Sequence, residues 1–184
     1  AEDSERLDTF DNVGLLDLLV SRGADIVEDL PEELKDKKSM AETIENNIRK
    51  TIVDENPTNP KYFEKMSVLL DELIEQRKQE VVDYKKYLEE MARLAEQVKR
   101  PQGSNYPKEI NTPGKQAIFD NFSQDTDWVL SLDHAIQTNK QDGYLTNKMK
   151  QKRLRAQLKP LTDEKGLDID EVFELIIKQT EYGA

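Results

Sequence analysis

The chain has 184 residues, of which 35% are charged and 36% hydrophobic, with a formal net charge of −11 and no cysteine. This length suits one domain with a sizeable core. The lack of cysteine excludes disulfides, cysteine-based zinc sites and a thiol nucleophile, and no apolar run reaches the roughly 18 to 20 residues that span a bilayer. We therefore expect a soluble, helix-rich protein in the cytoplasm.

The first apolar segment, "LLDLLV" at residues 15–20, is apolar on nearly every side and requires burial. It follows a short acidic start that begins at Ala1 and lacks the pattern of a secretory signal. We expect the chain to be part of a longer protein. Another domain of that protein is one candidate for covering this segment.

The next predicted helix starts near residue 39 and carries the most crowded polar cluster. Ser39 and Glu42 have the spacing of a capping box, and Glu45 and Arg49 have the spacing of an ion pair on the helix exterior. The Asn56-Pro57 step ends this helix, because a residue before proline disfavours the α conformation. Its apolar stripe consists of Met40, Ile44, Ile48 and Ile52.

The polar cluster of this helix is interpreted as structural or docking, with chemistry as the weaker alternative. Capping and ion pairing account for most of its members. The residues left for contact with a neighbouring helix or a partner, and so predicted as docking residues, are Asn46, Asn47 and Arg49.

Six further helices are predicted along the chain. Asn59-Pro60 supplies a cap and a first turn for the next helix, which runs to about residue 77. Residues 84–98 show the apolar spacing of a helix packed on another helix. Thr112-Pro113 offers another cap, and further helices are expected at 125–138, 145–158 and 168–179. The predicted fold is all-α, with about seven helices.

A stretch rich in Pro, Gly, Ser and Asn divides the chain. We expect two packed helical subdomains, at residues 1–100 and 114–184, with 101–113 as a linker. The first is acidic and includes the Asn-Pro hinge and a helical hairpin. The second contains a basic helix at 145–159.

The basic helix opposes the charge of the rest of the chain. Residues 139–160 carry a net charge of +6, whereas residues 1–60 carry −9. We expect Leu145, Met149 and Leu158 on its apolar side. Such a cationic face can bind phosphates or an acidic partner, although a solvated face that only balances the acidic domain is the favoured interpretation. The candidate contact residues are Lys148, Lys150, Lys152, Arg153, Arg155 and Lys159.

Tests for catalytic motifs are negative. His134 is the sole histidine, which excludes histidine-based zinc binding. Gly114-Lys115 does not complete a phosphate-binding loop, because Glu109 stands at the position of the required glycine and Gln116 follows the lysine. We predict no catalytic, cofactor-binding or metal-binding residue, and no enzymatic activity for this chain alone.

The block "AETIENNIRKTIVDENPTNPKYFEKMSVLLDELIEQRKQ", residues 41–79, resembles the C-terminal region of the restriction (motor) subunit of type I restriction-modification enzymes. The flanking segments "LLDLLVSRGADIVEDLPEELKDKK", "YKKYLEEMARLAEQV" and "DGYLTNKMKQKRLRAQL … FELIIKQTEY" agree in order and spacing. The resemblance extends from about residue 13 to residue 182 and is least specific at 100–139.

The resemblance implies an assembly role. The parent subunit would carry a nuclease domain and a DNA-translocating motor that need ATP and Mg²⁺, and its C-terminal helical domain would brace the motor and dock on the methyltransferase core of modification and specificity subunits. DNA contact through the basic helix is a further expectation. An autonomous acidic adaptor that binds another protein is the alternative.

Overall fold

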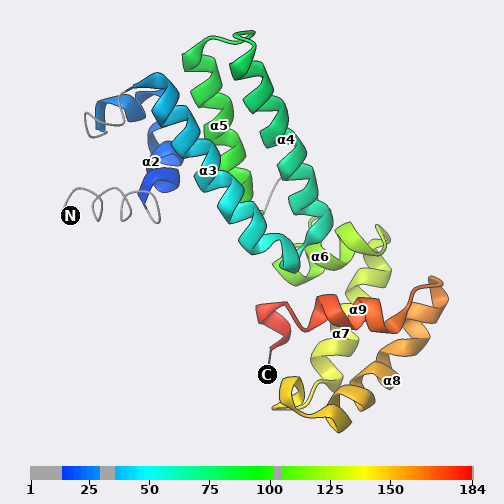
Figure 1. The fold of residues 1–184 in the computed structure, drawn as a ribbon. Coiled ribbons are helices and arrows are strands. Elements are labelled where there is room, and N and C mark those ends of the chain that lie inside the picture. Colours follow the sequence, from blue (N-terminus) through cyan, green and yellow to red (C-terminus); the bar gives the residue numbers. More distant parts are fainter. Residues whose placement is uncertain (1–13, 30–35, 102–104, 184) are drawn as a thin grey trace. The chain divides into compact units, whose positions relative to one another are not determined.

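The computed structural model describes residues 14–29, 36–101 and 105–183. Within these ranges the chain forms eight α-helices and no strand (Figure 1), so the predicted all-α class is confirmed. The residues fall into two compact units. Unit 1 comprises residues 1–55 and 63–101, and unit 2 comprises residues 56–62 and 102–184.

Unit 1 is built from four helices, α2 (Leu15–Arg22), α3 (Lys37–Glu55), most of α4 (Pro60–Lys78) and α5 (Tyr84–Lys99), with a 3₁₀ helix η2 (Gly23–Asp29) after α2. Helix α2 packs against α5, η2 and α3. Its side chains Leu15, Leu16 and Leu19 are buried there. The apolar segment at residues 15–20 is thus covered within its own unit.

Helix α3 begins two residues earlier than the sequence predicts, and the predicted capping box is wrong. The Asp36 carboxylate accepts a hydrogen bond of 2.9 Å from the Ser39 N–H, which lowers the pKa of Asp36. Ser39 is therefore already inside the helix, and Glu42 is exposed. An aspartate is at least as good a cap as serine, so the earlier start is favoured.

The other predicted boundaries of this region are confirmed. The stripe Met40, Ile44, Ile48 and Ile52 is buried, and α3 ends at Glu55. After the 3₁₀ turn η4 (Asn56–Thr58), Asn59 accepts the Tyr62 N–H at 3.3 Å and Pro60 opens α4. Helix α5 begins at a cap that was not predicted, since Asp83 accepts the Lys86 N–H at 2.9 Å.

Unit 2 contains α6 (Pro113–Asn121), α7 (Thr126–Asn139), α8 (Lys148–Glu164) and α9 (Ile169–Ile176), with 3₁₀ helices η5 (Tyr144–Thr146) and η6 (Thr180–Tyr182). Thr112 caps α6 as predicted. The helix expected at 145–158 instead begins at Lys148 and continues to Glu164, because Asn147 accepts the N–H groups of Met149 and Lys150.

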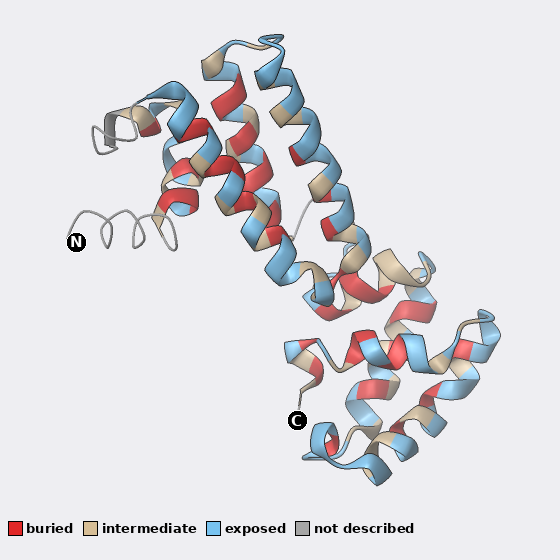
Figure 2. Cartoon of the chain, viewed as in Figure 1, coloured by how far each residue is buried: buried red, intermediate tan, exposed pale blue. Residues whose placement is uncertain are grey.

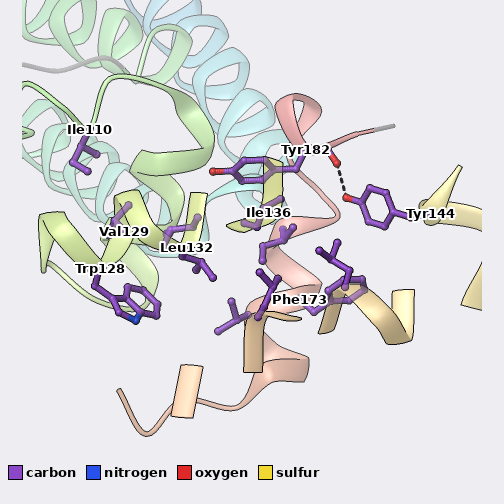
Figure 3. Close-up of a cluster of buried hydrophobic side chains, with 13 residues drawn as sticks. Ile110, Trp128, Val129, Leu132, Ile136, Tyr144, Phe173 and Tyr182 are labelled. Carbon is purple, nitrogen blue, oxygen red and sulfur yellow. Dashed lines mark hydrogen bonds between the residues drawn. The ribbon is translucent and has the colours of Figure 1, made fainter. Parts of the chain in front are cut away.

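Aromatic side chains join the elements of unit 2 (Figure 3). The Tyr144 hydroxyl donates to the Tyr182 carbonyl oxygen at 2.5 Å, the dashed line in Figure 3, and the Tyr182 hydroxyl donates to Asp133 at 2.6 Å. The indole N–H of Trp128 donates to the Leu161 carbonyl at 2.9 Å. Tyr144 also meets Phe173 edge to face, with ring centroids 6.5 Å apart. The hydroxyl and indole groups of these three aromatic residues are thus paired inside a largely apolar core.

The turn between α3 and α4 belongs to unit 2, which differs from the predicted division. Asn59 is 7% exposed; its amide nitrogen donates to Asp120 at 2.8 Å, and its amide oxygen accepts from Asn121 at 2.7 Å. Gln179 donates to the Thr58 carbonyl at 2.7 Å. Within the expected linker, Ile110 is buried in the core of unit 2.

Candidate docking surfaces

A buried carboxylate at Glu45 organises the inner face of α3. Glu45 is only 6% exposed. Its Oε1 accepts hydrogen bonds from Arg77 Nε at 2.6 Å and from the Tyr87 hydroxyl at 3.0 Å, and its Oε2 accepts from Arg77 Nη2 at 3.1 Å. The three residues come from α3, α4 and α5. The predicted ion pair of Glu45 with Arg49 is therefore wrong, because Glu45 lies beside the apolar stripe and turns inward.

The environment of this cluster favours one protonation state. The hydrogen bond that Arg77 donates to Glu45 raises the pKa of Arg77, so the guanidinium stays charged. Burial and the adjacent carboxylate raise the pKa of Tyr87, so its phenol stays neutral and donates. A bidentate arginine–carboxylate pair is strongly directional. The cluster consequently fixes how α4 is attached to α3 and α5.

The predicted docking residues occupy three different environments. Arg49 forms an ion pair with Asp71 and donates to the Ser67 hydroxyl at 3.3 Å, both on α4. The amide nitrogen of Asn47 donates to the Thr43 carbonyl at 2.9 Å, within the helix. Asn46 is exposed. The structure brings Arg49 to a neighbouring helix and leaves Asn46 open to solvent, and a docking role for all three stays a prediction.

A groove of about 600 Å³ lies between α4 and α5 of unit 1. Its apolar lining comes from both helices and the turn that joins them, and we call these residues the hairpin groove: Leu69, Leu73, Val81, Val82 and Leu94. Glu72, Lys86 and Arg93 stand among them. The lining on α4, at residues 69, 72, 73 and 76, follows the spacing of one helix face.

Exposure along α4 explains why the groove is open. Helix α4 buries only Phe63, Met66 and Leu70, whereas buried positions recur along α3 and α5 (Figure 2). Leu69 is 37% exposed and Val81 is 67% exposed. Half-covered apolar side chains along a helical hairpin are typical of a protein-binding surface.

The predicted basic residues of α8 divide into paired and unpaired groups. Arg155 lies 3.8 Å from Asp170 and over the Phe173 ring, 5.0 Å from its centroid. Lys159 pairs with Asp163 at 2.9 Å, and Lys150 donates to the Asp142 carbonyl. Within the described part of the chain, the exposed cations of α8 without a side-chain partner are Lys148, Lys152 and Arg153.

The predicted apolar side of α8 is only partly right. Leu158 is buried, but Leu145 is 41% exposed and Met149 is 62% exposed. The buried side chains of α8 are Leu154, Leu158 and Thr162. Since Met149 precedes Leu158 by nine residues, it lies about half a turn away around the helix. Leu145 precedes the helix in η5.

The motifs rejected from the sequence have structural roles where the structure describes them. Gly114 sits in the first turn of α6, where a Cβ would lie 2.6 Å from the Glu181 carboxyl carbon and 2.9 Å from the Tyr182 ring. His134 is exposed on α7. No group of three acidic or histidine side chains in the described ranges could hold a metal ion, and no helix described there is long and apolar enough to cross a membrane.

Sequence reasoning missed Arg77, Tyr87 and Asn59 as organising residues. The partners of Arg77 and Tyr87 lie 32 and 42 residues away, so no local spacing connects them to Glu45. One available signal was the position of Glu45, directly after Ile44 on the apolar stripe. Asn59 was recognised as a cap, but its contacts with α6 depend on tertiary packing.

Comparison with known proteins gives no match. No protein-family model, curated protein or solved structure matches the chain.

Proposed function

We propose that this chain is a helical assembly domain of the restriction subunit of a type I restriction-modification enzyme, acting in the cytoplasm. In this proposal the domain braces the ATP- and Mg²⁺-dependent motor of its own subunit and docks on the methyltransferase core. Nuclease and ATPase activities belong to other parts of the parent subunit, so this chain contributes binding and no chemistry of its own.

The observation that carries the proposal is the hairpin groove. It lies at the end of the block with the family resemblance, residues 41–79, and in the helix that follows. The Glu45, Arg77 and Tyr87 cluster holds α4 against α3 and α5, while Leu69 and Val81 stay accessible. A hairpin that this cluster already attaches, with an open apolar groove between its helices, suits capture of a partner helix. Little of the hairpin has to become ordered when the partner binds.

Capture of purified methyltransferase complex by the tagged chain tests this proposal. The wild-type chain is expected to retain the complex, and Leu69→Glu with Val81→Glu is expected to abolish retention, because each carboxylate would be desolvated in the contact. Val53→Glu is the matched control, since Val53 is 62% exposed on α3 and does not line the groove.

The same paired substitution in the full restriction subunit gives a second measurement. Translocation and assembly are expected to fall while the Val53→Glu subunit behaves as wild type. A folded wild-type chain that captures nothing, together with a full subunit unaffected by the groove substitutions, would show the assembly role to be wrong.

An autonomous acidic adaptor is the second candidate, favoured by the net charge of −11 and the sequence pI of about 4.7. The two candidates differ in which motifs the rest of the parent protein should contain. A parent with a phosphate-binding loop and helicase motifs before this region supports the first, and a parent without them supports the adaptor.

A further inference from the structure

A compact surface at the start of α8 combines unpaired positive charge with exposed apolar side chains. We call it the α8 patch and define it as Leu145, Lys148, Met149, Lys152 and Arg153. All five residues are exposed, and they lie within nine positions of the chain. Gln151 donates to the Leu145 carbonyl at 2.8 Å and thereby ties η5 to α8. The patch is therefore held on a fixed backbone.

The two apolar members distinguish this patch from an ordinary solvated basic face. Single exposed apolar residues are common and need no explanation. Here, however, Leu145 and Met149 are four residues apart in sequence and are two of the six large apolar side chains exposed in the described ranges. On the helix, Met149 falls between the direction of Lys148 and Lys152 and the direction of Arg153. An apolar side chain thus stands among three cations.

The chemistry of this arrangement favours one class of ligand. A nucleic-acid backbone would satisfy the cations but would offer nothing to Met149. An anionic membrane surface is best bound by a longer apolar helix face than two side chains provide. A protein segment with an apolar side chain flanked by carboxylates matches both the cations and the thioether, which adapts well to differently shaped partners.

We propose that the α8 patch binds an acidic amphipathic segment of a partner protein, with Met149 and Leu145 covering its apolar side chain and Lys148, Lys152 and Arg153 pairing with its carboxylates. This inference goes beyond the assembly proposal. It concerns a different unit from the hairpin groove and holds whether or not the parent is a restriction subunit. The α8 patch is positive, whereas the chain as a whole is negative. Attraction of an acidic partner segment is therefore confined to the patch itself.

Fluorescence anisotropy with a synthetic peptide tests the proposal. The probe carries leucines at helical spacing with glutamates on both flanks, and its comparison peptide has serine in place of each leucine. The wild-type chain is expected to bind the first more tightly than the second, and more weakly as salt rises. Lys148→Glu with Lys152→Glu is expected to weaken binding about tenfold, and Met149→Ser about fivefold.

Matched variants distinguish binding at the α8 patch from an effect of the net charge of the chain. Lys108→Glu with Lys178→Glu makes the same change in net charge at two other exposed lysines of unit 2, and is expected to bind like wild type. Equal loss in both pairs, or no binding by wild type, would overturn the proposal. So would tighter binding to duplex DNA or to anionic vesicles with no dependence on Met149. Because the groove variants leave this patch intact, failure here and failure of the assembly proposal are distinguishable.

Discussion

Units 1 and 2 are both all-α, yet different interactions join their helices. In unit 1, charged pairs cross between helices at Glu45 and Arg77 and at Arg49 and Asp71. In unit 2 a charged pair between helices, Arg155 with Asp170, lies near the surface, and buried neutral hydroxyl and indole groups bond to backbone carbonyls inside an aromatic core. Long charged side chains can join two helices that are not in close contact along the helix axes. In unit 1 the Glu45–Arg77 pair attaches α4 to α3 while the hairpin groove beside α4 stays open.

The largest expected effect comes from removing the cation of the buried pair. Arg77→Met would leave the Glu45 carboxylate buried and unpaired, which is expected to cost unit 1 about 3–5 kcal/mol of unfolding free energy. Hydrogen exchange of α3 and α5 amides measures this loss. The unfolding midpoint from the fluorescence of Trp128, the sole tryptophan and a residue of unit 2, is expected to change far less.

A double variant controls for packing. Glu45→Leu with Arg77→Met removes both charges and should recover most of the stability. Arg93→Met is the exposed-pair control, since Arg93 pairs with Glu90 in the same helix. If Arg77→Met alone costs less unfolding free energy than Arg93→Met, the importance given to the buried pair is wrong.

In unit 2 the matching test removes a neutral hydrogen bond. Tyr144→Phe leaves the buried Tyr182 carbonyl without its donor, and is expected to cost about 1–3 kcal/mol. Trp128 fluorescence during chemical unfolding reports this change, whereas amide exchange in α3 and α5 should be unaltered. A larger loss in unit 1 than in unit 2 would contradict the separation of the two units.

Alkaline pH provides a smaller test through Tyr84, whose hydroxyl is buried without a hydrogen-bond partner among the described residues. Burial raises the pKa of Tyr84 from 10.0 to about 12. The folded state therefore keeps its proton longer than the unfolded state, so its contribution is complete below pH 10 and is lost as pH rises toward 12. Tyr84→Phe should make the alkaline loss of unit 1 shallower in hydrogen-exchange measurements.

This substitution should leave the stability at neutral pH unchanged or slightly higher, because a buried hydroxyl without a partner is removed. Tyr62 of unit 2 provides the internal comparison, because burial raises its pKa to about 12 as well. The alkaline limb of Trp128 fluorescence should therefore be the same in Tyr84→Phe and wild type. A lower stability of unit 1 in Tyr84→Phe at neutral pH would show that the hydroxyl is stabilising.

The smallest effect is expected for Arg49, whose side chain is 40% exposed and whose partner Asp71 is 62% exposed. Arg49→Gln should cost less than about 1 kcal/mol, and high salt should erase the difference. This makes Arg49→Gln, alongside Asn46→Asp, a clean test of the predicted docking residues by capture of the methyltransferase complex. Retention equal to wild type in both variants would remove these positions from the docking surface.

Local signals predicted the helices well because caps and breaks act over a few residues. The predicted caps Asn59 and Thr112 each lie at the start of a helix, and the stripe from Met40 to Ile52 is buried. The errors at Glu45 and Met149 have a shared cause. Spacing along one helix shows which residues share a side, but only the neighbouring helices decide which side is covered.

The candidate surfaces could be predicted only in part for the same reason. Cationic residues of α8 were visible in the sequence, but their division into paired and free groups depends on Asp170, Phe173 and Asp142. The hairpin groove was not predicted. Leucines such as Leu69 and Leu73 fit a buried stripe equally well, and their partial exposure follows from how far α4 stands from α5.

The turn at residues 56–62 makes both units discontinuous in sequence. The chain enters unit 2 after Glu55, returns to unit 1 after Tyr62 and leaves again after Pro101. Cutting the gene near codon 101 would therefore yield no self-sufficient half, because the first piece would keep Asn59 while the second kept Asp120 and Asn121. Recombination could not exchange one unit for another by a single crossover. Neither unit is therefore encoded by one uninterrupted stretch of the gene.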